Sequence, residues 1–180
     1  TEDGLPKEYE INYLLTDSRQ LGAYPEQTLF FALHTDKNDG ANYIPDLYIK
    51  GVRAFVVTEE QYKVQGTKHD AQWIIVADVL RALQDLAAYK RSLYNCPVIA
   101  ITGSNGKTIV KEWLYQLLRN DYCITRSPKS YNSQIGVPLS VWQMNEQTQL
   151  AIFEAGISQP GEMERLERII RPTIGVITYI

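Results

Sequence analysis

Short apolar runs alternate with amphipathic stretches along the first half of the chain. Runs rich in β-branched and aromatic residues predict strands, and stretches with apolar residues three or four apart predict helices. Strands are expected at residues 28–33, 54–57 and 73–76, with a polar loop at 34–40, a helix at 43–50 that Gly51 stops, and a helix capped by Asp78. Strands alternating with helices indicate an α/β fold.

The second half of the chain continues the alternation. Strands are expected at 97–101, 122–125, 149–153 and 173–180, the last of them buried, with short helices at 139–144 and 160–170. A further helix carries the apolar stripe Ile109, Val110, Trp113, Leu114, Leu117 and Leu118. This order predicts a mainly parallel sheet with helices on both faces.

A domain boundary is predicted near Leu93, because Pro97 resets the chain after the preceding helix. Residues 1–93 then form a small mixed α/β domain, and residues 94–180 form the first part of a second, mainly parallel-sheet domain. The chain does not begin with methionine, and its last residues read as a strand that stops without a turn. We therefore expect a fragment of a longer protein.

Composition narrows the function classes. A net charge of −3 gives no basic field for nucleic acid, and no apolar run is long enough for membrane insertion. Cys96 and Cys123 form no CxxC or Cys/His cluster, which argues against a zinc site. Two free thiols and the lack of a signal-like N-terminus lead us to expect a cytoplasmic protein.

The segment from Thr102 to Thr108 carries the strongest candidate chemistry. It reads Thr-Gly-Ser-Asn-Gly-Lys-Thr between a predicted strand and a predicted helix, which is the context of a phosphate-binding loop. Backbone N–H groups of Gly103, Ser104, Asn105 and Gly106 would surround phosphate oxygens, Lys107 would reach the outer phosphates, and Thr108 would hold Mg²⁺. The alternative is an ordinary glycine turn with a solvated Lys107, since the full motif asks for glycine where Ile101 stands.

Other polar segments should meet this loop at the carboxyl edge of the sheet, where ligands of parallel sheets bind. They are Arg126–Gln134 and Glu154–Ser158. Glu154 directly follows an apolar strand, so its carboxylate could hold a nucleotide-bound Mg²⁺. The alternative for Glu154 is an ion pair with a nearby lysine or arginine, or a helix cap.

Together these residues resemble the Mur ligases, the ATP-dependent amide-bond ligases of peptidoglycan synthesis. Residues 101–108 are similar to the shortened phosphate loop of that family, and Phe153-Glu154-Ala155-Gly156 followed by Pro160-Gly161-Glu162-Met163 resembles its magnesium-binding segment. The resemblance implies ATP and Mg²⁺ as cofactors, Lys107 and Glu154 as catalytic residues, and Thr108 and Glu154 as metal ligands.

Two further segments resemble the members that join D-alanyl-D-alanine to UDP-N-acetylmuramoyl-tripeptide. One is Tyr131–Leu139, with Ser133 in place of a second asparagine; the other is Asp17-Ser18-Arg19 with the strand and the Asp39-Gly40 pair after it. The resemblance makes Asn132, Ser133, Ser18 and Arg19 candidates for substrate binding and makes residues 1–93 the domain that holds the UDP-sugar. Ser133 also resembles forms fused to an alanine racemase.

The resemblance also departs from the family pattern at the end of the chain. Tyr179 stands where the family usually has asparagine, and the family's carboxylated lysine, its downstream histidine and its C-terminal domain would lie beyond Ile180. We therefore expect no ligation by the 180-residue chain alone. Rival functions are another Mur-type ligase, a P-loop kinase or simple NTPase, and a nucleotide-sugar-binding module without enzymatic activity.

Overall fold

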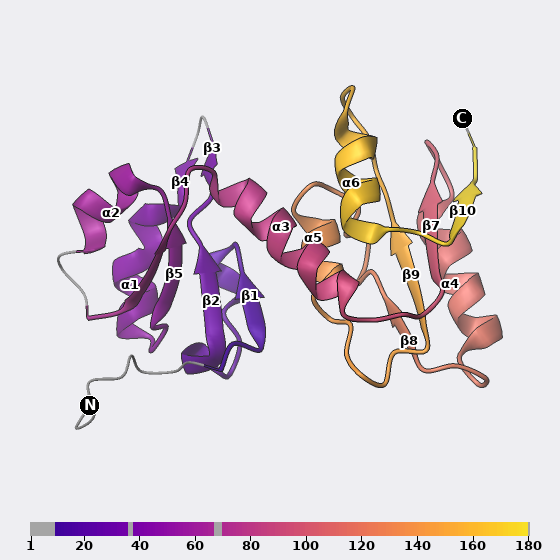
Figure 1. The fold of residues 1–180 in the computed structure, drawn as a ribbon, viewed down its shortest axis with the longest axis horizontal. Coiled ribbons are helices and arrows are strands. Elements are labelled where there is room, and N and C mark those ends of the chain that lie inside the picture. The colour runs from indigo at the N-terminus through magenta and orange to yellow at the C-terminus, as the bar shows by residue number, and fades with distance from the viewer. Residues whose placement is uncertain (1–9, 36–37, 67–69, 180) are drawn as a thin grey trace. The chain divides into compact units, whose positions relative to one another are not determined.

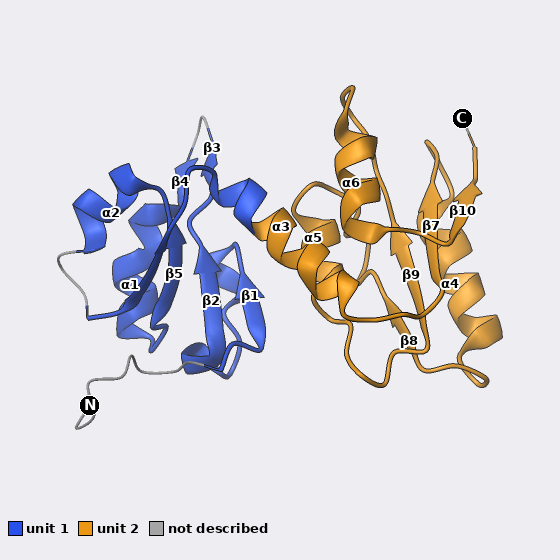
Figure 2. Ribbon diagram, viewed as in Figure 1, with its two compact units in different colours: residues 1–82 blue, residues 83–180 orange. Residues whose placement is uncertain are grey.

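The computed structural model describes residues 10–35, 38–66 and 70–179, and the chain divides into two compact units, residues 1–82 and 83–180 (Figure 2). Each unit contains its own four-stranded sheet, in which every pair of neighbouring strands is parallel. The predicted α/β class, with a small first domain and a mainly parallel second one, is confirmed.

The first unit is built on a sheet of order β1-β2-β5-β6 (Figure 1). Phe30 of β2 and Phe55 of β5 are almost fully buried side by side, and Phe55 stacks on Trp73 of β6 with ring centroids 5.2 Å apart. The elements are β1 (Tyr13–Leu15), β2 (Thr28–Phe31), α1 (Ile44–Ile49), β5 (Ala54–Val57), α2 (Glu59–Gln65) and β6 (Gln72–Ile75), with short 3-10 turns η1 (Ser18–Gln20), η2 (Pro25–Gln27) and η3 (Gly40–Tyr43).

The predicted polar loop at 34–40 is a two-stranded antiparallel pair, β3 (His34–Thr35) and β4 (Asn38–Asp39). The Asp39 carboxylate accepts hydrogen bonds from the Ala41 amide at 2.9 Å and from the Gln61 side chain at 2.6 Å. These contacts join the start of η3 to α2, so Asp39 stabilises the first unit internally.

The second unit has a sheet of order β10-β7-β9-β8, with helices on both faces as predicted (Figure 1). Alternate residues of β7 and β9 point to opposite faces: Ile99, Ile101 and Ile152 face α4, whereas Val98, Ala151 and Phe153 face the other helices. The elements are α3 (Val79–Ser92), β7 (Val98–Thr102), α4 (Lys107–Leu118), β8 (Ile124–Arg126), α5 (Gly136–Val141), β9 (Leu150–Glu154), α6 (Glu162–Ile170) and β10 (Ile174–Ile177).

The division between the units falls inside α3, before the boundary predicted near Leu93. The C-terminal half of α3 belongs to the second unit because its side chains bind there. Gln84 donates to the backbone and side chain of Gln134, and the buried Arg91 guanidinium donates to the carbonyls of Tyr94, Ile170 and Arg171. Pro97 marks the start of β7 and not the limit of the unit.

The structure corrects two predictions of burial. The expected stripe on α4 divides in two: Val110, Leu114 and Leu118 pack on the sheet, whereas Ile109, Trp113 and Leu117 are exposed. The last strand, β10, was expected to be buried, but among the described residues it lies at the sheet edge with Ile174 and Ile177 exposed.

The helix expected at 139–144 begins three residues earlier, at Gly136. The Ser133 hydroxyl accepts a hydrogen bond from the Gly136 amide, and Pro138 lies in the first turn, where a missing N–H costs little. None of the helices among the described residues has the length and apolar character needed to cross a membrane.

Candidate functional site

The connection between β7 and α4 has the form of a phosphate-binding loop. Strand β7 ends at Thr102, and α4 begins at Lys107 with Gly106 as its first flanking residue. Gly103 and Gly106 have φ angles of 132° and 83°, a region that residues with a Cβ rarely adopt. The loop therefore needs glycine at these two positions, and it ends at a helix N-terminus, where unpaired N–H groups favour anions.

Residues just after β10 hold this loop from the other side. Both the amide and the hydroxyl of Ser104 donate to the carbonyl of Tyr179, at 2.6 and 2.9 Å. The Thr178 hydroxyl lies within hydrogen-bond distance of the carbonyls of Thr102 and Asn105. The loop conformation thus depends on the pairing of β10 with β7.

Gly103 has a second reason to be glycine. A Cβ built there would lie 2.3 Å from Thr178 Oγ1 and 2.8 Å from the Tyr179 carbonyl oxygen. Both distances are far below van der Waals contact, and neither neighbour can move without breaking the hydrogen bonds that hold the loop.

We expect Gly103→Ala to destabilise the chain by about 1–3 kcal/mol, the usual cost of an L-residue held at such a φ. Because the loop must open to accept the methyl group, nucleotide binding should also be lost. Urea unfolding and calorimetric titration with ATP measure the two effects. Gly175→Ala in β10 is the matched control, since its Cβ would meet nothing within 4 Å. Equal behaviour of the two variants would contradict this description of the loop.

Lys107 lies in the first turn of α4 and folds back over the loop. Its ammonium group donates to the carbonyl of Gly103 at 2.6 Å, and the side chain is half-buried. This contact favours the phosphate-loop interpretation over an ordinary glycine turn with a fully solvated lysine. Its charge lies against the backbone that would surround a phosphate.

Glu154 ends β9 next to the loop, and its side chain is fully buried. In the sheet register it pairs with Ile101, which directly precedes the loop. Its Oε2 atom accepts a hydrogen bond from the Thr108 hydroxyl at 3.1 Å. Its Oε1 atom lies 2.9 Å from Lys111 Nζ. Glu154 therefore forms the ion pair with a lysine that was the alternative to a metal-binding role, and it contacts Thr108 as well.

These two oxygen-bearing side chains fit a magnesium ion. Mg²⁺ takes hard oxygen ligands and is usually held by one or two protein groups, with water and phosphate completing the shell. Thr108 Oγ1 and Glu154 Oε2 are adjacent, and Glu154 Oε1 is buried without a directed hydrogen bond. In the described part of the chain no group of three or more His, Cys, Asp or Glu side chains could hold a metal.

The segment after β8 reaches the same edge. The Ser130 and Thr108 hydroxyl oxygens lie 3.3 Å apart, and the carbonyl of Asn132 accepts from the Gly156 amide at 2.8 Å. A Cβ on Gly156 would touch the Asn132 side chain at 3.0 Å. The three predicted segments therefore meet. Asn132 lies beside the strand end that carries Glu154, whereas Ser133 caps α5 and is exposed.

The turn before α6 is held by the carboxylate of Glu162. Glu162 accepts hydrogen bonds from the amides of Ser158 and Gln159 and from the Ser158 hydroxyl. The Ser158 amide contributes most, and together these donors lower the pKa of the Glu162 carboxyl. Glu162 therefore stabilises the helix start, and Glu154 is the carboxylate that faces the loop.

Ser18 and Arg19 lie in the first unit, in the 3-10 turn η1 after β1. Arg19 donates to the Asp17 carboxylate through its side chain at 2.7 Å, and these hydrogen bonds lower the pKa of Asp17. The Arg19 side chain is otherwise 86% exposed, and Ser18 is half-buried. A ligand would find Ser18 and the Asp17–Arg19 pair on an accessible turn.

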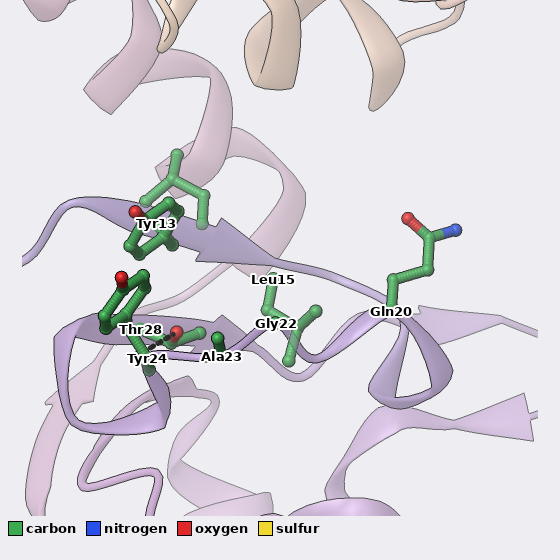
Figure 3. A pocket seen from close by; sticks show the side chains of 8 residues that line it. Tyr13, Leu15, Gln20, Gly22, Ala23, Tyr24 and Thr28 are labelled. Atoms are coloured by element: carbon green, nitrogen blue, oxygen red, sulfur yellow. Dashed lines mark hydrogen bonds between the residues drawn. The ribbon is translucent and has the colours of Figure 1, made fainter.

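A cavity of about 270 Å³ lies near this turn, between β1 and the segment that leads to β2. Figure 3 shows the rings of Tyr13 and Tyr24 lying parallel, and their centroids are 5.8 Å apart. The Thr28 hydroxyl donates to the Tyr24 carbonyl at 2.8 Å and fixes the start of β2. The other lining residues are Leu14, Leu15, Gln20, Gly22 and Ala23.

Sequence reasoning missed two parts of the site. Lys111 is fully buried against Glu154, although a lysine one helical turn after Lys107 reads as a solvated residue. Its place between Val110 and Leu114, which face the sheet, was the available signal. The contacts of Thr178 and Tyr179 with the loop depend on strand pairing and left no signal in the sequence.

Comparisons with known proteins agree with this architecture. The model of the family described as "Mur ligase middle domain" matches residues 101–180. The chain is 33% identical over 175 residues to UDP-N-acetylmuramoyl-tripeptide–D-alanyl-D-alanine ligase of Borreliella burgdorferi, covering 94% of the chain and 38% of that protein. It is 35% identical over 171 residues to the ligase of the same name from Bacillus subtilis, covering 94% of the chain and 36% of that protein.

Solved structures give the same result. A crystal structure of MurF from Acinetobacter baumannii superposes with a TM-score of 0.84 at 29% identity, covering 98% of this chain and 37% of that one. MurF from Thermotoga maritima, solved in complex with ADP, superposes with a TM-score of 0.79 at 25% identity, covering 97% and 39%. The chain thus spans little more than a third of the length of these relatives. Residues 101–180 thus match a Mur ligase middle domain, and the chain is similar to one part of these ligases.

Proposed function

We propose that the whole protein joins D-alanyl-D-alanine to UDP-N-acetylmuramoyl-tripeptide at the expense of ATP, as the names of its relatives describe for them. The observation that carries the proposal is the contact of Thr108 with the buried Glu154 beside the Gly103–Thr108 loop. Similarity to these ligases over 94% of the chain supports the same assignment.

In this proposal the second unit binds ATP. Backbone N–H groups of the loop, apart from that of Ser104, which donates to the Tyr179 carbonyl, neutralise phosphate charge together with the Lys107 ammonium, and Thr108 and Glu154 hold Mg²⁺. ATP supplies the phosphoryl group that activates the tripeptide carboxylate as an acyl phosphate, and the amine of D-alanyl-D-alanine displaces that phosphate. Catalysis of this kind consists mainly of positioning and charge neutralisation.

The first unit is proposed to hold the UDP-sugar substrate. Ser18 and Arg19 lie on an accessible turn after β1, and an apolar cavity with two stacked tyrosines lies beside that turn. Asn132, at the edge of the ATP site, is proposed to contact the same substrate where it is activated. Ser133 is proposed to act through the start of α5, which it caps.

The test is a ligation assay on the whole protein, with mass spectrometry of the UDP-linked product. We expect UDP-N-acetylmuramoyl-pentapeptide only when ATP, Mg²⁺, the tripeptide substrate and D-alanyl-D-alanine are all present. The 180-residue chain alone is expected to form none, since it spans little more than a third of its relatives. ADP release without an amine acceptor would favour a simple NTPase, phosphate transfer to an alcohol would favour a kinase, and binding without turnover would favour a nucleotide-sugar-binding module.

Alanine racemase activity is a separate proposal that rests on Ser133 alone. The relatives are named for a ligase activity and not for a racemase. Conversion of L-alanine to D-alanine by the whole protein would support it, and its absence would leave the ligase proposal untouched. A cytoplasmic location without nucleic-acid partners stays a prediction from composition.

A further inference from the structure

Lys111 is a charged residue of the second unit that the sequence does not predict to be buried. It lies one helical turn after Lys107 on α4, and its side chain is 0% exposed. Burying a lysine is costly unless its charge is paired and its protons are used in hydrogen bonds. The contacts of its ammonium group therefore indicate what the residue does.

Two backbone carbonyls and one carboxylate surround the Lys111 ammonium. It donates to the carbonyl oxygens of Ser127, at 2.9 Å, and Lys129, and it lies 2.9 Å from Glu154 Oε1. Glu112 Oε1 lies farther away, at 3.3 Å, and is itself paired with Arg126 near the surface. The two backbone carbonyls hold the ammonium in place independently of Glu154.

The two carboxylate oxygens of Glu154 consequently have different surroundings. Oε1 faces the fixed ammonium, and Oε2 faces the Thr108 hydroxyl at 3.1 Å. Because the two oxygens are chemically equivalent, what matters is the orientation of the carboxyl plane, and turning that plane out of this orientation would weaken both contacts. Lys111 thus fixes this orientation, with one oxygen of Glu154 toward the phosphate loop, and it compensates the negative charge that remains buried.

The same ammonium also joins three chain segments. It connects α4, which carries Lys107 and Thr108, to the end of β9 and to residues 127–129. The last of these segments leads to Asn132 and has Lys129 at a positive φ of 49°. Lys111 thus links all three parts of the site with one charged group.

We propose that Lys111 is a positioning residue for Mg²⁺: it orients Glu154 so that Oε2 and the Thr108 hydroxyl form the metal-binding pair. The inference rests on the proposed nucleotide function, and it adds a residue that acts on the metal through Glu154. Second-layer groups of this kind change metal affinity by about 10–100-fold when they are removed.

The test measures ATP binding by the chain with Mg²⁺ and with EDTA, in the wild type, Lys111→Met, Glu154→Gln and the double variant. Methionine keeps the length of the side chain and removes its charge. We expect Lys111→Met to reduce the Mg²⁺-dependent gain in ATP affinity about 10–100-fold while leaving the affinity in EDTA within about twofold. Glu112→Gln, the matched control, should keep the wild-type gain because Glu112 lies outside the Thr108–Glu154 pair.

If Lys111→Met does not fold, the double variant still tests the role of Lys111. Removing both charges leaves no unpaired buried ion, so Lys111→Met/Glu154→Gln should unfold at a higher temperature than Lys111→Met. If Lys111 acts through Glu154, the double variant should show the same residual Mg²⁺ dependence as Glu154→Gln alone. A further loss beyond Glu154→Gln, or an unchanged Mg²⁺ gain in Lys111→Met, would overturn the inference.

If Lys111 had a purely structural role, Lys111→Met would weaken ATP binding equally with Mg²⁺ and with EDTA. That result would also overturn the inference. Failure of the proposed function is recognised separately, in the wild type. A wild-type chain that binds no ATP under either condition would contradict the nucleotide site itself, and the assignment of Lys111 would fall with it.

Discussion

Replacing Lys107 with alanine is expected to lower the ATP-dependent turnover of the whole protein about 100–1000-fold, the usual effect of removing one preorganised charge-stabilising donor. The ammonium group lies against the loop backbone, 2.6 Å from the Gly103 carbonyl, and is the cationic side chain that α4 places in its first turn. Without it, the loop amides alone must offset the negative charge of the phosphates. Calorimetric titration of the chain with ATP should show a matching loss of affinity.

Lys63→Ala is the control for this experiment. Lys63 is an exposed residue of α2 in the first unit, paired with Glu59 one turn earlier, so its removal should change stability and ATP binding little. Lys107 is half-buried, and its ammonium donates to a backbone carbonyl, so Lys107→Ala leaves no buried carboxylate without its counter-charge and should also fold normally. Wild-type turnover in Lys107→Ala would refute the role given to this lysine.

Replacing Glu154 with glutamine is expected to have two large effects. It should abolish most of the Mg²⁺ dependence of ATP binding, because a neutral amide is a poor ligand for a hard dication. It should also destabilise the chain by about 3–5 kcal/mol, because Lys111 would remain buried without its counter-charge. Urea unfolding measures the second effect in the absence of any ligand.

The two effects of Glu154→Gln can be separated from a general loss of charge. Glu167→Gln removes a carboxylate from the exposed face of α6 and should leave both properties nearly unchanged. Full stability of Glu154→Gln would mean that Lys111 does not depend on this carboxylate. Full Mg²⁺ dependence in that variant would mean that the metal is held elsewhere.

Much of the fold follows from local sequence patterns, because apolar runs and helix caps act over a few residues. Strand β5 was predicted with its observed bounds, and Asp78 accepts a hydrogen bond from the Arg81 amide at the start of α3 as a cap should. Burial was harder to predict. The exposed side of α4, at Ile109, Trp113 and Leu117, and the edge position of β10 depend on strand order, which periodicity does not encode.

The part of the site that lies at the carboxyl ends of strands could be predicted from the sequence. Parallel strands bring their carboxyl ends to one edge, so the convergence of the loop, Asn132 and Glu154 followed from element order. Lys111 was not found, because its burial depends on carbonyls that the segment after β8 contributes. The anchoring of Ser104 by Tyr179 likewise requires the pairing of β10 with β7, far apart in sequence.

The central claim is that ATP binds at residues 103–108 with Mg²⁺ held by Thr108 and Glu154. The most direct test is to follow the backbone amide NMR signals of the chain while ATP and Mg²⁺ are added. We predict that the largest shifts fall on Gly103 to Thr108, with Mg²⁺-dependent shifts at Thr108 and Glu154. Shifts confined to the first unit, or a loop whose signals do not respond, would contradict the account.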